Sequence, residues 1–399
     1  MRVVFINQFG WPDSAPTSQL LCDVSRFLVK EGHEVDIVCG AATYVRDGDT
    51  DPPPVRIHRV PCYRFGRGAR RIVSYATFML CAAWKVLRLP KPDVVVTMTT
   101  PPLLSLLGTF LKIVRRDKHF SWEMDLFPEA LVDTGMASAG SSLLRLLHRL
   151  ARYSRRNSEG IIVLGECMKQ RVVDSGVPTK QVHVAENWAD SRIIDCAPFR
   201  RSDALTVLYS GNLGLTHDID TITGAMARLS NARQLSFRFV GDGKGYNQVR
   251  EFVSQHAVQN VSFQGYCPRA ALSENLASAD VGLVTQLASC MGTVVPSKIY
   301  GLMAAGRPIL FVGPRESTVA RVIEQYRCGW QIDNGDTAGL ISLLQWLQEN
   351  RGSVEACGGR GRRAFLDHYD LAVGVTRVAR ILGFEVAEPA VRGRAAQVS

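Results

Sequence analysis

The stretch ALTVLYSGNLG (residues 204–214) runs from an apolar segment into a glycine loop, and a helix over about 218–229 is expected to follow it. The pattern returns in LSFRFVGDG (residues 235–243), which also ends in a glycine loop. A strand, a glycine loop and a helix in succession are typical of a parallel sheet covered by helices. In such loops the backbone N–H groups and the helix N-terminus favour an anion such as a diphosphate, although a tight turn without a ligand has the same pattern.

The first half of the chain shows the same alternation. Apolar runs stand at VVFIN (3–7), EVDIVCG (34–40), DVVVTMTT (93–100), EGIIVLG (159–165) and VHVAENWAD (182–190), and a helix over about 17–31 separates the first two. A polar linker near 197–203 precedes the second half. The pattern predicts the α/β class with two facing Rossmann-like domains, residues 1–192 and 204–365. A terminal segment, residues 366–384, is expected to pack its helix back on the first domain.

The composition is that of an ordinary folded protein with a basic balance. Of 399 residues, 46% are hydrophobic and 21% are charged, and the formal net charge is +10. Such a charge suits phosphorylated small molecules, anionic lipid or nucleic acid, but nucleic acid is disfavoured because the basic clusters lack interleaved stacking side chains. Ten cysteines without a C-x-x-C pair or zinc spacing indicate a reducing, cytoplasmic compartment. Neither a signal peptide nor an uninterrupted membrane span is expected.

A second loop and helix are predicted in VPSKIYGLMAAGRPILFVG (residues 295–313). Pro296 and Ser297 suit the start of a helix, and Gly306 suits its end. Lys298 then stands in the first turn, where the helix dipole disfavours a cation unless an anion is bound nearby. The position therefore favours phosphate binding over a solvated lysine.

Taken together in this order, these segments resemble the retaining glycosyltransferases of family four, which have the GT-B fold. Within them the chain is similar to the subgroup that includes colanic-acid fucosyltransferases and O-antigen N-acetylfucosaminyltransferases. The resemblance is carried by residues 7–28 (NQFGWPDSAPTSQLLCDVSRFL), 122–136 (WEMDLFPEALVDTGM), 161–178 (IIVLGECMKQRVVDSGVP), 186–190 (ENWAD), 209–221 (YSGNLGLTHDIDT), 239–243 (FVGDG) and 295–313.

The resemblance implies transfer of a sugar, with retention, from a UDP- or GDP-sugar to a lipid-linked or saccharide acceptor in cell-surface polysaccharide biosynthesis. Neither a metal nor another cofactor is implied. The nucleotide sugar would be bound in the second domain by Ser210, Gly211, Asn212, Gly214, His217, Gly241, Asp242, Gly243, Pro296, Ser297 and Lys298. The implied acceptor-side residues are Pro16, Thr17 and Asn187, and the implied catalytic residues are Asp125, Glu129 and Lys298. For Asp125, a cap of the turn before Phe127-Pro128 is an equal alternative.

The chain departs from the commoner family pattern at several functional positions. Many members grip the diphosphate with an Arg and a Lys where this chain has Asn212 and His217. Many also have two glutamates where it has Thr293 and Gly301. Two other classes therefore stay open: a nucleotide-sugar epimerase of the same fold, and a non-catalytic partner subunit.

Two basic segments predict a peripheral position on the inner face of the plasma membrane. Seven Lys or Arg and no acid stand between Arg64 and Lys91, around an apolar stretch, and five Arg and no acid stand between Arg145 and Arg156. Cations beside an apolar helix suit an interfacial element near anionic headgroups. The alternative is a buried helix with solvated arginines. Asp218 and Asp220 stand two apart on a helix and face different ways, so no metal site is expected there.

Overall fold

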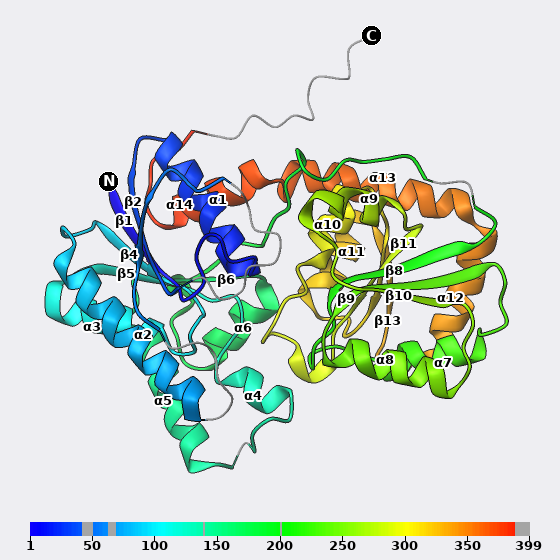
Figure 1. The fold of residues 1–399 in the computed structure, drawn as a ribbon, viewed down its shortest axis with the longest axis horizontal. Coiled ribbons are helices and arrows are strands. Elements are labelled where there is room, and N and C mark those ends of the chain that lie inside the picture. The colour runs from blue at the N-terminus through cyan, green and yellow to red at the C-terminus, as the bar shows by residue number, and fades with distance from the viewer. Residues whose placement is uncertain (42–50, 63–68, 139, 200–201, 388–399) are drawn as a thin grey trace, which may run out of the picture. The chain divides into compact units, whose positions relative to one another are not determined.

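The computed structural model describes residues 1–41, 51–62, 69–138, 140–199 and 202–387, which form two compact units (Figure 1). The first unit contains Met1–Glu186, Gly292–Val294 and the described residues from Gly374 onward. The second contains Asn187–Met291 and Val295–Val373. The boundary therefore falls within the last helix, α14 (Leu371–Ile381), and a three-residue segment of the second half belongs to the first unit.

The first unit is built on a seven-stranded parallel sheet with the order β3-β2-β1-β4-β5-β6-β7. Its strands are β1 (Arg2–Ile6), β2 (Glu34–Cys39), β3 (Arg56–Arg59), β4 (Val94–Thr97), β5 (Lys118–Trp122), β6 (Gly160–Val163) and β7 (Val182–Val184). Its helices are α1 (Pro16–Lys30), α2 (Ala69–Arg88), α3 (Ser105–Arg115), α4 (Glu129–Asp133), α5 (Ser142–Asn157) and α6 (Glu166–Asp174). One core joins the sheet residues Val4, Ile6 and Val38 to Phe78 of α2 and Leu111 of α3.

The second unit is built on a six-stranded parallel sheet with the order β10-β9-β8-β11-β12-β13. Its strands are β8 (Leu205–Asn212), β9 (Leu235–Asp242), β10 (Val261–Gln264), β11 (Val281–Thr285), β12 (Ile309–Val312) and β13 (Gly329–Ile332). Its helices are α7 (Asp220–Arg228), α8 (Lys244–Gln255), α9 (Leu272–Ala277), α10 (Lys298–Ala304), α11 (Thr318–Tyr326), α12 (Thr337–Glu349) and α13 (Arg351–His368).

Both faces of the second sheet are buried, which explains its continuous apolar runs. Leu208 and Val240 belong to the core on one face, whereas their neighbours Tyr209 and Phe239 belong to the core on the other. Successive side chains of a strand point to opposite faces, so each strand contributes to two cores. The α/β class predicted from the sequence is confirmed.

Two local predictions needed correction. The stretch predicted as a strand over 182–190 forms a strand only over Val182–Val184. The sequence analysis also missed β3, an edge strand that carries arginines at both ends and has no fully buried residue. A short polar edge strand lacks the apolar run by which a buried strand is found. Within the described residues, no helix is long and apolar enough to cross a membrane.

Candidate functional site

The two glycine loops of the second unit lie side by side at the carboxyl ends of adjacent parallel strands. Gly211 of β8 is paired in register with Gly241 of β9, and Asn212 with Asp242. Strand β8 has β9 on one side and β11 on the other. The chain order therefore reverses direction beside β8, and ligands of open α/β sheets bind at this point.

Glycine is required at both positions by the backbone and by close packing. Gly211 and Gly241 have φ angles of 125° and 140°, which L side chains rarely adopt. A Cβ atom on Gly241 would meet the carbonyl oxygen of Gly211, and one on Gly211 would lie 2.9 Å from Cε of Lys298. Because Gly211 and Gly241 have no side chains, the two loops and Lys298 can approach one another closely.

Lys298 stands at the start of α10 and lies against the glycine loop at Gly211; the structure gives it no anionic partner within the described residues. Its ammonium donates to the carbonyl oxygen of Asn212 at 3.2 Å, lies 3.4 Å from Nε2 of His217, and is 5.2 Å from the centre of the Tyr209 ring. Within the described residues no carboxylate pairs with it. Desolvation lowers the pKa of this half-buried amine to about 8. The neutral groups around this cation do not compensate its charge, so it can form a charge-assisted hydrogen bond to a bound anion.

His217 is a neutral neighbour of Lys298 and not a second cation. Burial, with a smaller contribution from the charge of Lys298, lowers its pKa to about 3. Its Nδ1 lies 3.2 Å from the carbonyl oxygen of Gly214. We assign the proton to Nδ1, because Nε2 can then accept from the lysine. The charge available to an anion in this loop cluster therefore comes from Lys298.

The other sequence-predicted residues of the second unit are placed around the same loops. The Ser210 hydroxyl accepts from Nδ2 of Asn275 at 2.9 Å, and the Asp242 carboxylate accepts from the N–H of Gly243 at 2.7 Å. Gly243, with a φ of 126°, immediately precedes α8, and Ser297 immediately precedes α10 after Pro296. The structure thus brings together Ser210, Gly211, Asn212, Gly214, His217, Gly241, Asp242, Gly243, Pro296, Ser297 and Lys298 in one unit.

The first unit separates the two acidic candidates. The Asp125 side chain is exposed and makes no hydrogen bond or ion pair within the described residues, while its backbone bridges to Val294. An exposed carboxylate is ionised at neutral pH and is able to accept a proton. Asp125 therefore remains available for chemistry.

Glu129 is buried and held by an arginine. Burial alone would raise the pKa of its carboxyl, but Arg155 outweighs this effect and lowers it. The Arg155 guanidinium donates to Glu129 at 2.7 Å and to both oxygens of Glu123 at 3.1 Å. These contacts favour a structural role for Glu129.

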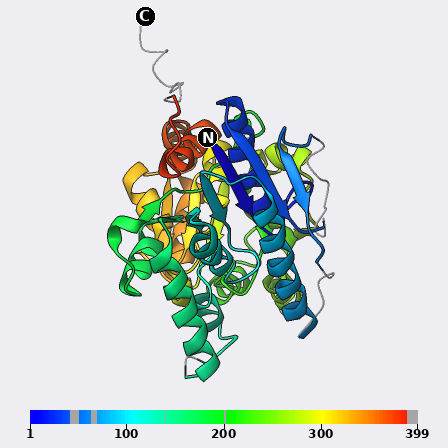
Figure 2. The same cartoon turned by 90° about the vertical axis from the view of Figure 1, so that its left-hand side faces the viewer.

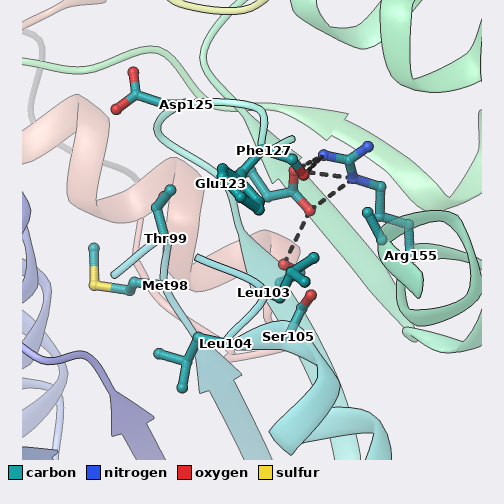
Figure 3. Close-up of a pocket in the computed structure, with 11 residues that line it drawn as sticks. Met98, Thr99, Leu103, Leu104, Ser105, Glu123, Asp125, Phe127 and Arg155 are labelled. Carbon is teal, nitrogen blue, oxygen red and sulfur yellow. Dashed lines mark hydrogen bonds and ion pairs between the residues drawn. The ribbon is translucent and has the colours of Figure 1, made fainter. Parts of the chain in front are cut away.

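Glu123 and Arg155 line a cavity that the sequence analysis missed. Asp125 also lines it, but Figure 3 shows the carboxylate of Asp125 pointing away from the Glu123–Arg155 pair. The sequence signal was present in the run WEMDLFPE, where Glu123 follows a buried strand. Arg155 could not be distinguished from the other arginines of its segment, which was predicted to lie on the surface. For Arg155 that prediction is wrong, because the side chain is 3% exposed and paired with two carboxylates.

The acceptor-side candidates do not share one unit. Pro16 and Thr17 begin α1 in the first unit, where the Thr17 hydroxyl accepts from Nδ2 of Asn7 at 3.3 Å. Asn187 is buried and is grouped with the second unit. Asp218 is buried and accepts from the backbone and hydroxyl of Thr221, which is the contact of a helix cap. Among the described residues, no group of acidic, histidine and cysteine side chains has the arrangement of a metal site.

The two units, each built on a parallel sheet covered by helices, have the fold of the GT-B class. A glycosyl transferase 4-like domain model matches residues 20–188, and a glycosyl transferases group 1 model matches residues 204–350. The chain belongs to this glycosyltransferase family, whose members are enzymes.

Three proteins show how the chain relates to others of this class. WbjE of Pseudomonas aeruginosa, named as a glycosyltransferase, is 27% identical over 82% of this chain and 86% of its own. WcaI of Escherichia coli K12, named as a glycosyl transferase of colanic acid biosynthesis, is 22% identical over 76% of this chain and 81% of its own. The structure of Anabaena HepE in complex with UDP and glucose is 13% identical with a TM-score of 0.72, over 96% of this chain and 99% of HepE. That likeness shows the shared fold.

Proposed function

We propose that the protein transfers a sugar, with retention, from a UDP- or GDP-sugar to a lipid-linked or saccharide acceptor in cell-surface polysaccharide biosynthesis. The observation that carries the proposal is Lys298, a half-buried cation that lies against the glycine loop at Gly211 and has no carboxylate partner among the described residues. The presence of UDP in the HepE complex and the role of WcaI in colanic acid biosynthesis support the ligand and the pathway class.

In this reaction the residues of the site would position the donor sugar and stabilise the charge of the leaving diphosphate. In a displacement on the donor's front face, negative charge develops on the leaving diphosphate, and a fixed cation and backbone N–H groups stabilise it. Lys298 and the loops at Gly211 and Gly241 supply these groups in the second unit. Asp125 supplies the exposed carboxylate that engages a sugar hydroxyl. No step requires a metal.

A thermal-shift screen against UDP-, GDP- and dTDP-sugars tests this function. A ligand at 100 times its dissociation constant adds about 2.7 kcal/mol to the free energy of unfolding. We expect one base to stabilise the protein and the other two to do so much less. If none of them raises the melting temperature, the donor site is misassigned and a non-catalytic subunit becomes the better explanation. Turnover of the donor without any acceptor would indicate an epimerase.

Donor affinity should depend on pH through Lys298. Its pKa of about 8 means that the ammonium is present below pH 8 and is lost as the pH rises through that value. Because the diphosphate binds the charged form, affinity for UDP should be full at pH 7 and fall by up to about tenfold per unit above pH 8. Calorimetric titration between pH 7 and 9.5 measures this. In Lys298→Arg, whose guanidinium stays charged, the fall should disappear; if it persists, another group controls binding.

Substitution of Asp125 should affect catalysis and leave nucleotide binding intact. Asp125→Asn removes the charge of an exposed side chain with no partner in the described structure, so folding should be unchanged. We expect turnover to fall by about 10²-fold or more, the usual contribution of a proton-accepting group. The affinity for UDP should stay within twofold of the wild type, since Asp125 belongs to the other unit. A variant with full turnover would mean that Asp125 takes no part in the reaction.

We also propose that the protein docks on anionic membrane through the first unit. Helix α3 packs against α2 and α5, and these three helices are visible together in Figure 2. None of the three contains an acidic residue. Their exposed apolar side chains are Ile72, Val73, Leu80, Trp84 and Leu87 on α2, Phe110, Ile113 and Val114 on α3, and Leu143, Leu146 and Tyr153 on α5. We call this set the apolar face.

The exposure of these apolar side chains and the positive charge around them favour a lipid surface as the partner of the apolar face. Leu80 is 72% exposed and Ile72 is 70% exposed. Exposed apolar side chains that are scattered singly are common, but a set gathered on adjacent helices marks an interaction surface. Exposed arginines border these side chains on α2 (Arg70, Arg71 and Arg88) and on α5 (Arg145, Arg149, Arg152 and Arg156). Apolar side chains bordered by cations fit the boundary between acyl chains and anionic headgroups. Arg64 and Arg67, also predicted to take part, lie outside the described residues.

A further inference from the structure

The cavity at the carboxyl ends of β4 and β5 contains an ion cluster whose charges do not balance. One guanidinium, that of Arg155, contacts two carboxylates, those of Glu123 and Glu129. All three side chains are at most 10% exposed. Two buried carboxylates thus share one guanidinium, and a buried carboxylate that shares its cation is costly unless further hydrogen-bond donors reach it.

The two glutamates differ in what else they contact. Glu129 has a second basic neighbour, because Nδ1 of His148 lies 3.9 Å from its carboxylate, and it does not line the cavity. Glu123 lines the cavity, and within the described chain its carboxylate accepts only from Arg155 and, at 3.3 Å, from the Ser121 hydroxyl. These four hydrogen bonds come from three donors, because the Nε–H of Arg155 is shared between the two carboxylate oxygens. A carboxylate has about four acceptor positions, so one more donor can reach Glu123.

The other residues that line the cavity, and its volume, restrict the kind of group that could donate to Glu123. Ser105 lines the cavity and its hydroxyl has no partner within the described residues. Leu103, Leu104 and Met98 form an apolar wall. Leu103 has a φ of 61°, a left-handed conformation that is strained for a non-glycine residue and that clusters at functional sites. The cavity volume of about 20 Å³ admits one water or one hydroxyl group.

We propose that this cavity is the subsite for a single hydroxyl group of a bound sugar, which donates to Glu123 and accepts from Ser105. A hydroxyl both donates and accepts, whereas an ammonium group only donates and would leave Ser105 unused as a donor. Glu123 contacts the substrate, and Arg155 is a positioning residue that holds the carboxylate in place. This inference rests on the proposed sugar transfer and adds a residue to it.

The test compares Glu123→Gln with Glu129→Gln. Both variants remove one carboxylate charge from Arg155, but only the first changes the cavity wall. The probes are UDP, UDP-glucose, UDP-galactose and the methyl glycosides of glucose, galactose and N-acetylglucosamine, with affinities measured by calorimetry or saturation-transfer NMR. We expect Glu123→Gln to weaken the binding of at least one sugar by about tenfold or more, as for loss of a bond to a charged group. UDP itself should bind as in the wild type.

The probes also distinguish the two sources of such a hydroxyl. A loss confined to a UDP-sugar places the subsite on the donor sugar, and a loss confined to a methyl glycoside places it on the acceptor. Ser105→Ala should weaken the same sugar by a few-fold, and this variant keeps the test valid if Glu123→Gln does not fold. If Glu129→Gln weakens that sugar as much as Glu123→Gln does, or if all variants bind every probe as the wild type does, the cavity holds only water and the proposal is wrong. Failure of the proposed function itself would differ, since neither UDP nor GDP would then bind to the wild type or to any variant.

Discussion

Replacement of Lys298 by alanine should weaken UDP binding by about 10- to 100-fold, which corresponds to about 1.5–3 kcal/mol for a charge-assisted hydrogen bond to phosphate. The loss should be large because Lys298 is the cation that the structure places against the glycine loop at Gly211, and His217 beside it is neutral. Turnover of the true donor should fall at least as much, because the developing charge on the leaving diphosphate depends on the same group.

The melting temperature provides the control for this variant. Lys298 has no carboxylate partner in the described structure, so its removal breaks no ion pair and relieves a desolvated charge. The unliganded variant should therefore melt no lower than the wild type. Arg228→Ala, which removes an exposed cation from the last turn of α7 in the same unit, should leave UDP affinity unchanged. If Lys298→Ala binds UDP within twofold of the wild type, Lys298 is a solvated lysine and the site lies elsewhere.

Reversal of Arg70 and Arg71 to glutamate should weaken binding to anionic vesicles by about 10³-fold at low salt. Each basic residue near an anionic surface contributes about 1 kcal/mol, and each reversal also adds a repulsion of similar size, so two reversals amount to about 4 kcal/mol. Cosedimentation with vesicles of phosphatidylglycerol and phosphatidylcholine measures the effect. Wild-type binding should fall steeply between 50 and 500 mM salt, roughly as the Debye length shortens.

A second pair of variants separates the charges from the apolar face. Leu80→Ser with Ile113→Ser removes two exposed apolar side chains, 72% and 66% exposed, from α2 and α3 without changing the charge. This double variant should lose the salt-resistant part of the binding, because apolar burial is not screened by ions. Reversal of Arg228 and Arg233, on the second unit, is the matched charge control and should have little effect. If the wild-type protein ignores anionic vesicles at low salt, the acceptor need not be at a membrane and a soluble saccharide is the better candidate.

The sequence by itself determined the class of fold and the place of the two glycine loops. Strands buried on both faces leave continuous apolar runs, and glycines at positive φ stand at the carboxyl ends of β8 and β9, so both signals are local. Lys298 was also recognisable, because a cation in the first turn of a helix opposes the helix dipole. These features depend on a few neighbouring residues and can be read without knowing what packs against them.

The tertiary structure decided which of several similar side chains does what. Asp125 and Glu129 are both acids in one short motif, but within the described part of the chain only Asp125 is left unpaired. Glu129 instead faces an arginine that α5 contributes from 26 residues further along the chain. Arg155 and Arg156 are neighbours in sequence, yet one is buried and the other exposed, since consecutive helix positions point about 100° apart. The exposed face of α3 was missed for the same reason: burial and charge neutralisation are properties of partners brought together by folding, and a single stretch of sequence does not contain them.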